Sequence, residues 1–525
     1  MSIVKMKNWS LFKSPQIIFP KYQYFFNSIC RAFSAASLDS SEMEEFMEYM
    51  ESLKNYEKSG VPKNAGTDSG DGFDLGRMRH LLQQLGNPQS KFKAFHVAGT
   101  KGKGSTATFL SGILRAEGYS VGCYTSPHIR TIRERMTLGK SGEPVSAKEL
   151  NSHFQKIKKD LYIAVELEKG HLSHFEAGLG GARDATNVIT SSDLAVAIIT
   201  NIGEEHLAAL GGSLESIALA KSGIIKYGRP LVLGGTFLPH IERMIIDRAM
   251  SSCSPVISVT DPGNRIIIKG LSRESQIPRQ LCDVVLQIKR DLCVFVELFD
   301  VKLRLLGSHQ LQNAATATCA ALCLRDQGWA LSDASIRTGL EGAYLLGRGQ
   351  FLTSKEAEVL GLPGATVLLD GAHTKDSAQA LANVIKTTFP EARLVFVVAM
   401  ANDKDHLGFA TELISVGCLE AVVFTEVNIA GDKSRTASAS LLKDSWIEAS
   451  REMGIDFLYS GTTKHGDQCT PSTQKRGRRP ILFAEGSLED SMSFGHRILG
   501  AKSCGVIIFT GSLHIVSAVL GRLHG

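Results

Sequence analysis

The segment "AFHVAGTKGKGSTATFL", residues 94–110, contains the most informative structural pattern in the sequence. A short β-rich run leads into a glycine-rich turn, and a helical pattern begins directly after the turn. This order is typical of a phosphate-binding loop, where backbone N–H groups and the positive end of a helix face an anion. The usual pattern G-x-x-x-x-G-K-[ST] is broken twice, because Val97 stands at the first glycine position and Gly104 follows Lys103.

The loop still has the chemistry that ATP requires. Its glycines free the backbone to turn N–H groups toward a phosphate, and Lys103 is placed to reach the β- and γ-phosphates. The candidate ATP-binding residues of the loop are Gly99, Thr100, Lys101, Gly102, Lys103, Gly104 and Ser105. The alternative is a tight strand-to-helix turn that carries a surface lysine.

Gly104 raises the question of what holds the magnesium ion that accompanies ATP. Magnesium needs oxygen ligands, and glycine has no side-chain oxygen. The next β-rich run ends in Thr125 and Ser126. Because the carboxyl ends of parallel strands lie side by side, a hydroxyl there is well placed to replace the missing one.

Outward from this stretch, the chain alternates between β-rich and helical segments. It has 525 residues, which is too long for one core, so two or more domains are expected. Helices are expected over 40–60 and 74–88. The β-rich runs are 92–98, 121–126, 194–202, 229–235, 365–373, 392–400, 419–427 and 504–512. The alternation predicts an α/β fold with a mostly parallel sheet and helices on both faces.

The amino-terminal segment has a distinct composition. Residues 1–38 carry five basic side chains and no acidic one, so they account for the whole formal net charge of +5. This composition predicts an organellar transit peptide, and the expected location is the mitochondrial matrix. A basic tail without a targeting role is the alternative. The ten scattered cysteines predict reduced thiols rather than disulfides or a zinc site.

The charge and hydropathy of the remaining chain exclude two classes of partner. Without residues 1–38 the chain is neutral, which argues against a nucleic-acid partner. The basic cluster 475–479 is interpreted as part of a solvated surface insertion over 461–481, with a nucleic-acid signal as the alternative. No apolar run reaches about 18 residues, so no membrane-spanning helix is expected.

Three segments, 98–106, 122–136 and 176–187, resemble the dihydrofolate synthase and folylpolyglutamate synthase family of the Mur ligase superfamily. Their sequences are AGTKGKGST, GCYTSPHIRTIRERM and EAGLGGARDATN. The resemblance implies a P-loop ATPase domain over 39–345, with a mostly parallel sheet, and a smaller Rossmann-like α/β domain over 346–525. It also implies a monomer.

The resemblance further implies a set of site residues. Two magnesium ions would be held by Ser126, Glu176, His206 and Lys221, with Lys221 carbamylated into an oxygen ligand. ATP would be contacted by the loop and by Asn313, Arg348, Asp370 and His373. Lys103, Lys221 and Arg348 would act in catalysis, and the pterin would be contacted by Phe175, Asp184 and Ala185.

The implied reaction joins L-glutamate to a pteroate through an acyl phosphate, at the expense of ATP. The segment LSHFE, 172–176, is more similar to dihydrofolate synthases than to the polyglutamate-adding enzymes, so dihydropteroate is the expected substrate. Together with the leader, this resembles a plant mitochondrial dihydrofolate synthase. Folylpolyglutamate synthase remains the alternative.

The sequence departs from the family pattern near residue 176. There, LSHFE runs directly into EAGLGG, and Glu176 ends one motif and begins the next. A helix and a buried strand that the family places between them are absent, and the strand is expected beside the phosphate-loop strand. The junction is typical of an exon-skipped isoform or a sequence error. A catalytically impaired folate- or ATP-binding isoform is therefore a further alternative.

Overall fold

The computed structural model of the chain describes residues 2–5, 43–52, 75–167, 181–205, 207–272, 277–288, 294–429, 433–459, 479–500 and 505–523. They belong to two compact units. The first unit takes the described residues of 1–267, 283–301 and 312–343, and the second those of 268–282, 302–311 and 344–525. The sequence places the domain boundary after residue 345, and the two units divide after residue 343. Segments 268–282 and 302–311 also group with the second unit.

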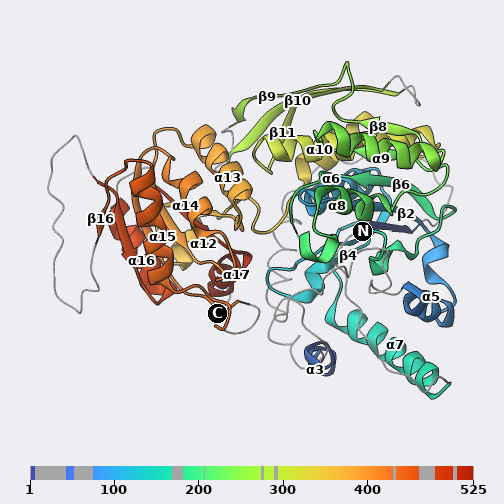
Figure 1. The fold of residues 1–525 in the computed structure, drawn as a ribbon, viewed down its shortest axis with the longest axis horizontal. Coiled ribbons are helices and arrows are strands. Elements are labelled where there is room, and N and C mark those ends of the chain that lie inside the picture. Colours follow the sequence, from blue (N-terminus) through green and yellow to red (C-terminus); the bar gives the residue numbers. More distant parts are fainter. Residues whose placement is uncertain are drawn as a thin grey trace, which may run out of the picture. The chain divides into compact units, whose positions relative to one another are not determined.

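The first unit is built on an eight-stranded sheet with the order β5-β4-β3-β1-β2-β6-β7-β8 (Figure 1). Its strands are β1 (Ser2–Lys5), β2 (Lys93–Ala98), β3 (Ser120–Tyr124), β4 (Met136–Leu138), β5 (Glu143–Pro144), β6 (Leu194–Ile199), β7 (Leu231–Leu233) and β8 (Val256–Ser258). β2, β6, β7 and β8 are parallel. All six residues of β6 are buried, as expected for a strand covered on both faces.

The helices of the first unit are α3 (Glu44–Ser52), α5 (Leu75–Gln84), α6 (Lys103–Ala116), α7 (Ala147–Leu167), α8 (Leu214–Ser222), α9 (Pro239–Ser251), α10 (Ser308–Asp326) and α11 (Asp333–Gly342). Three of these helices begin at a glycine turn or a serine cap: α6 after Gly102, α8 after Ser213 and α11 after Ser332. Short 3-10 turns are η1 (Pro88–Lys91), η2 (Ile132–Arg135), η3 (Ala185–Val188) and η4 (Leu207–Leu210). Helices expected over 40–60 and 74–88 correspond to α3 and α5, and residues 40–42, 53–60 and 74 lie outside the described residues.

One strand of this sheet was not expected. β1 lies between β2 and β3 and is antiparallel to both. It comes from the leader, and it holds the position beside the phosphate-loop strand that the sequence left without a strand. The structure therefore places residues 2–5 of the basic leader inside the sheet, and the expected mitochondrial targeting stays a prediction.

The second unit contains a seven-stranded sheet with the order β12-β13-β18-β14-β15-β17-β16. Its strands are β12 (Gln350–Phe351), β13 (Thr366–Leu369), β14 (Arg393–Val398), β15 (Leu419–Phe424), β16 (Leu458–Tyr459), β17 (Ile481–Ala484) and β18 (Gly505–Thr510). All neighbours are parallel except β12 and β13. The expected α/β fold is thus confirmed in both units. The pairing is mostly parallel in the second unit, whereas in the first unit β2, β6, β7 and β8 pair in parallel and β1, β3, β4 and β5 pair with antiparallel neighbours.

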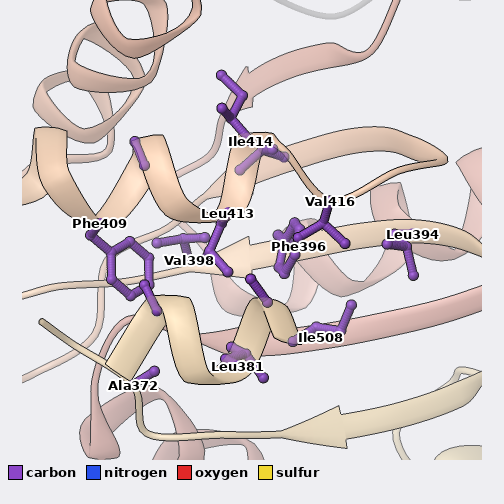
Figure 2. Close-up of a cluster of buried hydrophobic side chains, with 14 of the residues drawn as sticks. Ala372, Leu381, Leu394, Phe396, Val398, Phe409, Leu413, Ile414, Val416 and Ile508 are labelled. Carbon is purple, nitrogen blue, oxygen red and sulfur yellow. The ribbon is translucent and has the colours of Figure 1, made fainter. Parts of the chain in front are cut away.

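Helices cover this second sheet and bury its apolar side chains. They are α12 (Ser354–Val359), α13 (Lys375–Thr388), α14 (His406–Ile414), α15 (Ala439–Glu452), α16 (Leu488–Leu499) and α17 (Leu513–Arg522). Figure 2 shows Leu381 of α13 and Phe409 and Leu413 of α14 packed over Phe396 of β14 and Ile508 of β18. This core fixes the carboxyl ends of the strands. Asp370 and His373, which are expected to contact ATP, follow the carboxyl end of β13.

A separate three-stranded sheet has the order β11-β10-β9 and was missed by the sequence analysis. Its strands are β9 (Arg265–Ser272), β10 (Arg279–Ile288) and β11 (Val294–Leu303). Alternate residues of β10 are buried, which is the pattern of a sheet covered on one face.

Two further expectations concern the part of the chain that the structure describes. The six cysteines in it are free thiols, in agreement with the expected reduced state. None of its helices combines the length and apolar character needed to cross a membrane. The expected surface insertion over 461–481 lies mostly outside the described residues.

Candidate active site

The phosphate loop between β2 and α6 depends on two glycines. Gly99 has a φ of 150° and Gly102 has a φ of 83°, and residues with a side chain rarely adopt these backbone angles. A Cβ on Gly99 would lie 1.9 Å from Thr200 Oγ1, and a Cβ on Gly102 would lie 2.4 Å from Asn313 Oδ1. The loop therefore requires glycine at both positions, and Asn313 of α10 lies against it.

The end of β6 holds the loop in place. Thr200 Oγ1 donates to the Lys101 carbonyl over 2.5 Å. Asn201 Oδ1 accepts from the Lys101 backbone N–H over 2.7 Å, and the Asn201 carbonyl accepts from Thr100 N–H over 3.0 Å. The sequence analysis missed Thr200 and Asn201. Their position at the carboxyl end of a parallel strand beside β2 was the signal that could have found them.

Lys103 opens α6 and folds back across the loop. Its Nζ donates to the Gly99 carbonyl over 2.7 Å and to the Thr100 carbonyl over 2.9 Å. The cation thus lies beside the first turn of α6, where the helix dipole also favours negative charge. The geometry is suited to a phosphate group, as the sequence predicted.

Lys221 lies in the last turn of α8 and reaches the same loop. Its side chain is buried, with 5% of the residue exposed, and its Nζ donates to the Gly99 carbonyl over 2.9 Å. Burial and the nearby charge of Lys103 lower the pKa of the Lys221 amine to about 7, although Glu205 and Asp184 oppose the shift. A substantial fraction of this amine is therefore uncharged near neutral pH.

Asp184 and Ala185 lie at the start of η3 in the same unit. Asp184 caps this turn and is buried. Its Oδ1 accepts from the Thr186 backbone N–H over 2.8 Å and from Thr186 Oγ1 over 2.6 Å. Thr186 Oγ1 in turn lies 2.8 Å from Nε2 of His96, which is on β2. The sequence analysis missed Thr186 and His96.

The expected metal ligands are only partly described. Ser126 follows β3 and is exposed, and Ser105 is buried within α6. Glu176 and His206, and the expected pterin contact Phe175, lie outside the described residues. Within the described ranges, no three His, Cys, Asp or Glu side chains form a group that could hold a metal ion. Glu205 forms an ion pair of 3.5 Å with Lys101, so the residue preceding His206 contacts the loop.

The second unit contributes three expected ATP contacts of its own. Asp370 follows β13, and its two carboxylate oxygens accept from the backbone N–H groups of Gly349 and Ala372 over 2.8 and 2.9 Å. Burial raises the pKa of Asp370, against the opposing effects of the Arg348 charge and the two N–H donors. His373 Nδ1 lies 2.8 Å from the Gly371 carbonyl and must donate to it. Arg348, Asp370 and His373 therefore gather at one end of the second sheet.

Comparison with known proteins agrees with this arrangement. The Mur ligase middle domain matches residues 97–321, and the domain described as "Mur ligase, glutamate ligase domain" matches residues 357–468. The dihydrofolate synthase/folylpolyglutamate synthase of Bacillus subtilis (strain 168) is 32% identical over 439 residues, covering 79% of this chain and 92% of the relative. The chain belongs to this family. The family comprises ligases that join folates and glutamate through a carbon–nitrogen bond.

Solved structures show the same fold. The folylpolyglutamate synthase of Thermotoga maritima is 25% identical, with a TM-score of 0.63, and the match covers 86% of this chain and 93% of that one. The folylpolyglutamate synthase of Mycobacterium tuberculosis complexed with ADP is 21% identical, with a TM-score of 0.70 and coverage of 92% and 99%. At 21% identity, the similarity to the Mycobacterium tuberculosis protein supports the fold alone.

Proposed function

We propose that this family member is a dihydrofolate synthase, which joins L-glutamate to 7,8-dihydropteroate at the expense of ATP. The observation that carries the proposal is the gathering of Lys103 and Lys221 on the carbonyl of Gly99, inside a loop shaped for phosphate. The preference for dihydropteroate is supported by the sequence likeness of 172–176 and by the buried carboxylate of Asp184.

ATP fits the residues that are present. The tight turns at Gly99 and Gly102 leave the backbone of the loop next to the start of α6, and Lys103 supplies a cation there. Asn313 lies against Gly102 and is suited to contact the base or ribose. In the second unit, Arg348, Asp370 and His373 are the residues for which the resemblance implies ATP contacts.

Magnesium would be held by Ser126, Glu176, His206 and Lys221, three of which can supply an oxygen once Lys221 is carbamylated. Bound magnesium would neutralise negative charge on the phosphoryl oxygens. The uncharged fraction of the Lys221 amine can attack carbon dioxide, forming a carbamate and releasing a proton. The carbamate keeps one N–H that can still donate to Gly99. Two ions and this modification are part of the proposal.

In the proposed reaction, a carboxylate oxygen of dihydropteroate attacks the γ-phosphorus of ATP. The bond to the bridging oxygen breaks, ADP leaves, and an acyl phosphate remains. The amino group of glutamate then attacks the acyl carbon, loses a proton and displaces inorganic phosphate. Negative charge develops on the phosphoryl oxygens, which Lys103 and Arg348 are suited to stabilise.

Two alternatives are favoured by specific observations. Folylpolyglutamate synthase activity is favoured by the names of several relatives, including that of Bacillus subtilis. A catalytically impaired isoform is favoured by the short connection before Gly181 and by the leader strand β1 beside β2. The mitochondrial location is proposed from the composition of residues 1–38 alone. A reporter fused to these residues that stayed in the cytosol would contradict it.

A glutamate-dependent ADP-release assay separates these possibilities. We expect ADP release with dihydropteroate to exceed that with tetrahydrofolate at equal concentration. A preference for tetrahydrofolate would indicate the polyglutamate-adding activity instead. No glutamate-dependent release with either substrate would indicate the impaired isoform.

A further inference from the structure

Two buried side chains and a half-buried threonine of the first unit form a hydrogen-bonded chain that leads from β2 to η3. His96 is buried in the middle of β2, with 3% of the residue exposed, and Asp184 is buried at the start of η3. Thr186 lies between them. Its Oγ1 is 2.8 Å from His96 Nε2 and 2.6 Å from Asp184 Oδ1. The two ends of this chain are far apart in sequence and are joined only by the fold.

The protons of this chain can be assigned from the chemistry of the three groups. An ionised carboxylate only accepts, so the single hydroxyl proton of Thr186 is donated to Asp184. Thr186 Oγ1 must then accept from His96, which requires the proton of the neutral ring to be on Nε2. The Nδ1 atom has no hydrogen-bond partner within the described residues.

The neutral state of His96 agrees with this assignment. Burial lowers the pKa of His96 to about 3, so the ring carries one proton at neutral pH. Within the described part of the chain, that proton has one available partner, the Thr186 hydroxyl. The tautomer of His96 is therefore fixed by a neighbour that is itself fixed by Asp184.

The carboxylate of Asp184 is held through one oxygen only. Oδ1 accepts from both the N–H and the hydroxyl of Thr186. Among the described residues, no hydrogen bond reaches Oδ2. The charge of Asp184 is also close enough to Lys221 to act on it, which places the carboxylate near the phosphate loop.

We propose that His96 is a positioning residue that acts through Thr186 to hold Asp184 with Oδ2 turned toward the pterin ring of the substrate. The inference rests on the proposed function. The aminopyrimidinone edge of a reduced pterin carries adjacent N–H donors, and a carboxylate held in one orientation is a matched acceptor for them. Without the donation from His96, the Thr186 hydroxyl can rotate and Asp184 loses a fixed partner.

Matched pairs of substitutions test this role. Thr186→Val removes the hydroxyl with little change in volume, whereas Thr186→Ser keeps it. His96→Leu removes the ring donor, whereas the amide of His96→Gln can still donate. We expect Thr186→Val and His96→Leu to raise the KM for dihydropteroate about tenfold, with the KM for ATP unchanged. We expect Thr186→Ser and His96→Gln to restore most of the loss.

Thermal melting separates this role from a merely structural one. A fall in Tm accompanied by equal rises in the KM for ATP and for dihydropteroate would overturn the proposal. So would equal dihydropteroate KM values for Thr186→Val and Thr186→Ser.

A second readout does not depend on turnover. Nitrogen-15 NMR of histidine-labelled protein, with the His96 signal assigned by its loss in His96→Gln, reports the tautomer directly. We expect the proton on Nε2, and a proton on Nδ1 would overturn the hydrogen-bonded chain. Failure of the unsubstituted protein to turn over dihydropteroate would count against the proposed function. The NMR measurement would still show whether the His96 proton is on Nε2 or on Nδ1, and so would still test the hydrogen-bonded chain.

Discussion

Lys221 is a buried amine placed beside a second lysine, and its stability effect has a definite sign. Its pKa falls from 10.5 to about 7 on folding, first through burial and then through repulsion by Lys103. Between these values the unfolded chain binds a proton that the folded chain does not. The free energy of unfolding therefore rises as the pH rises from about 7 toward 10.5, because the folded chain has already lost this proton. Below about pH 7 the buried amine is charged, and its full destabilising effect on the folded state is present.

Denaturation in urea between about pH 7 and pH 9 checks this prediction when the protein is compared with Lys221→Met. The substitution removes the titrating amine and keeps a long apolar side chain. We expect the free energy of unfolding to rise less steeply with pH in Lys221→Met. Buffers free of carbon dioxide keep the amine unmodified. If the free energy of unfolding depended on pH equally in the two proteins, the burial of the Lys221 amine beside Lys103 would be contradicted.

Residues of the site differ in how far the sequence could predict them. Lys103 and Lys221 belong to short motifs, so the sequence indicates both without knowledge of their partners. Thr200 and His96 were missed because each acts on a residue about 90 to 100 positions away, through pairings that only the sheet creates. Arg348, Asp370 and His373 were predicted from the resemblance, and the structure brings them together within the second unit.

At the scale of elements, β1 is the strand whose role is least expected. Its backbone pairs on one side with β2 and on the other with β3, along edges that are otherwise buried. Unpaired backbone groups on such edges cost free energy, so we expect deletion of residues 2–5 to lower the Tm by about 2 to 4 °C or more. A deletion of equal length elsewhere in the leader is the control. Equal melting temperatures for the two deletions would contradict the pairing.

A variant chain with the family's helix and strand inserted between Phe175 and the EAGLGG motif provides a second test of this position in the sheet. We expect the restored strand to lie beside β2 and to displace β1. The restored chain should melt at a higher temperature than the present one, and deletion of residues 2–5 should then have little effect on it. A restored chain that remained equally sensitive to the deletion would show that the two strands do not compete for one position.

The elements themselves were largely predictable, for physical reasons that also explain the exceptions. β6, β14, β15 and β18 each contain at least four consecutive apolar residues that are all buried, which is the pattern of strands covered on both faces. The strands β9 to β11 were not among the expected elements, because β10 alternates between buried and half-buried residues and has no run of four or more apolar residues. β1 was missed because its residues lie in a basic leader, whose composition indicates targeting and carries no information about strand pairing.

For the whole molecule, the proposed reaction places the reacting carboxylate on the substrate. In that proposed reaction no side chain acts as a nucleophile, and the chain's own contribution would be to bind phosphate, hold the pterin and neutralise charge. The central claim is that ATP activates the carboxylate of dihydropteroate as an acyl phosphate. That claim predicts the fate of one oxygen atom, because the carboxylate oxygen that attacks phosphorus leaves with the phosphate.

The most direct measurement follows that oxygen. Dihydropteroate labelled with oxygen-18 in its carboxylate is incubated with the protein, ATP and L-glutamate, and the inorganic phosphate is analysed by mass spectrometry. An incubation without glutamate is the control. The account predicts one oxygen-18 atom in each phosphate released with the amide product. Formation of the amide with unlabelled phosphate would contradict it.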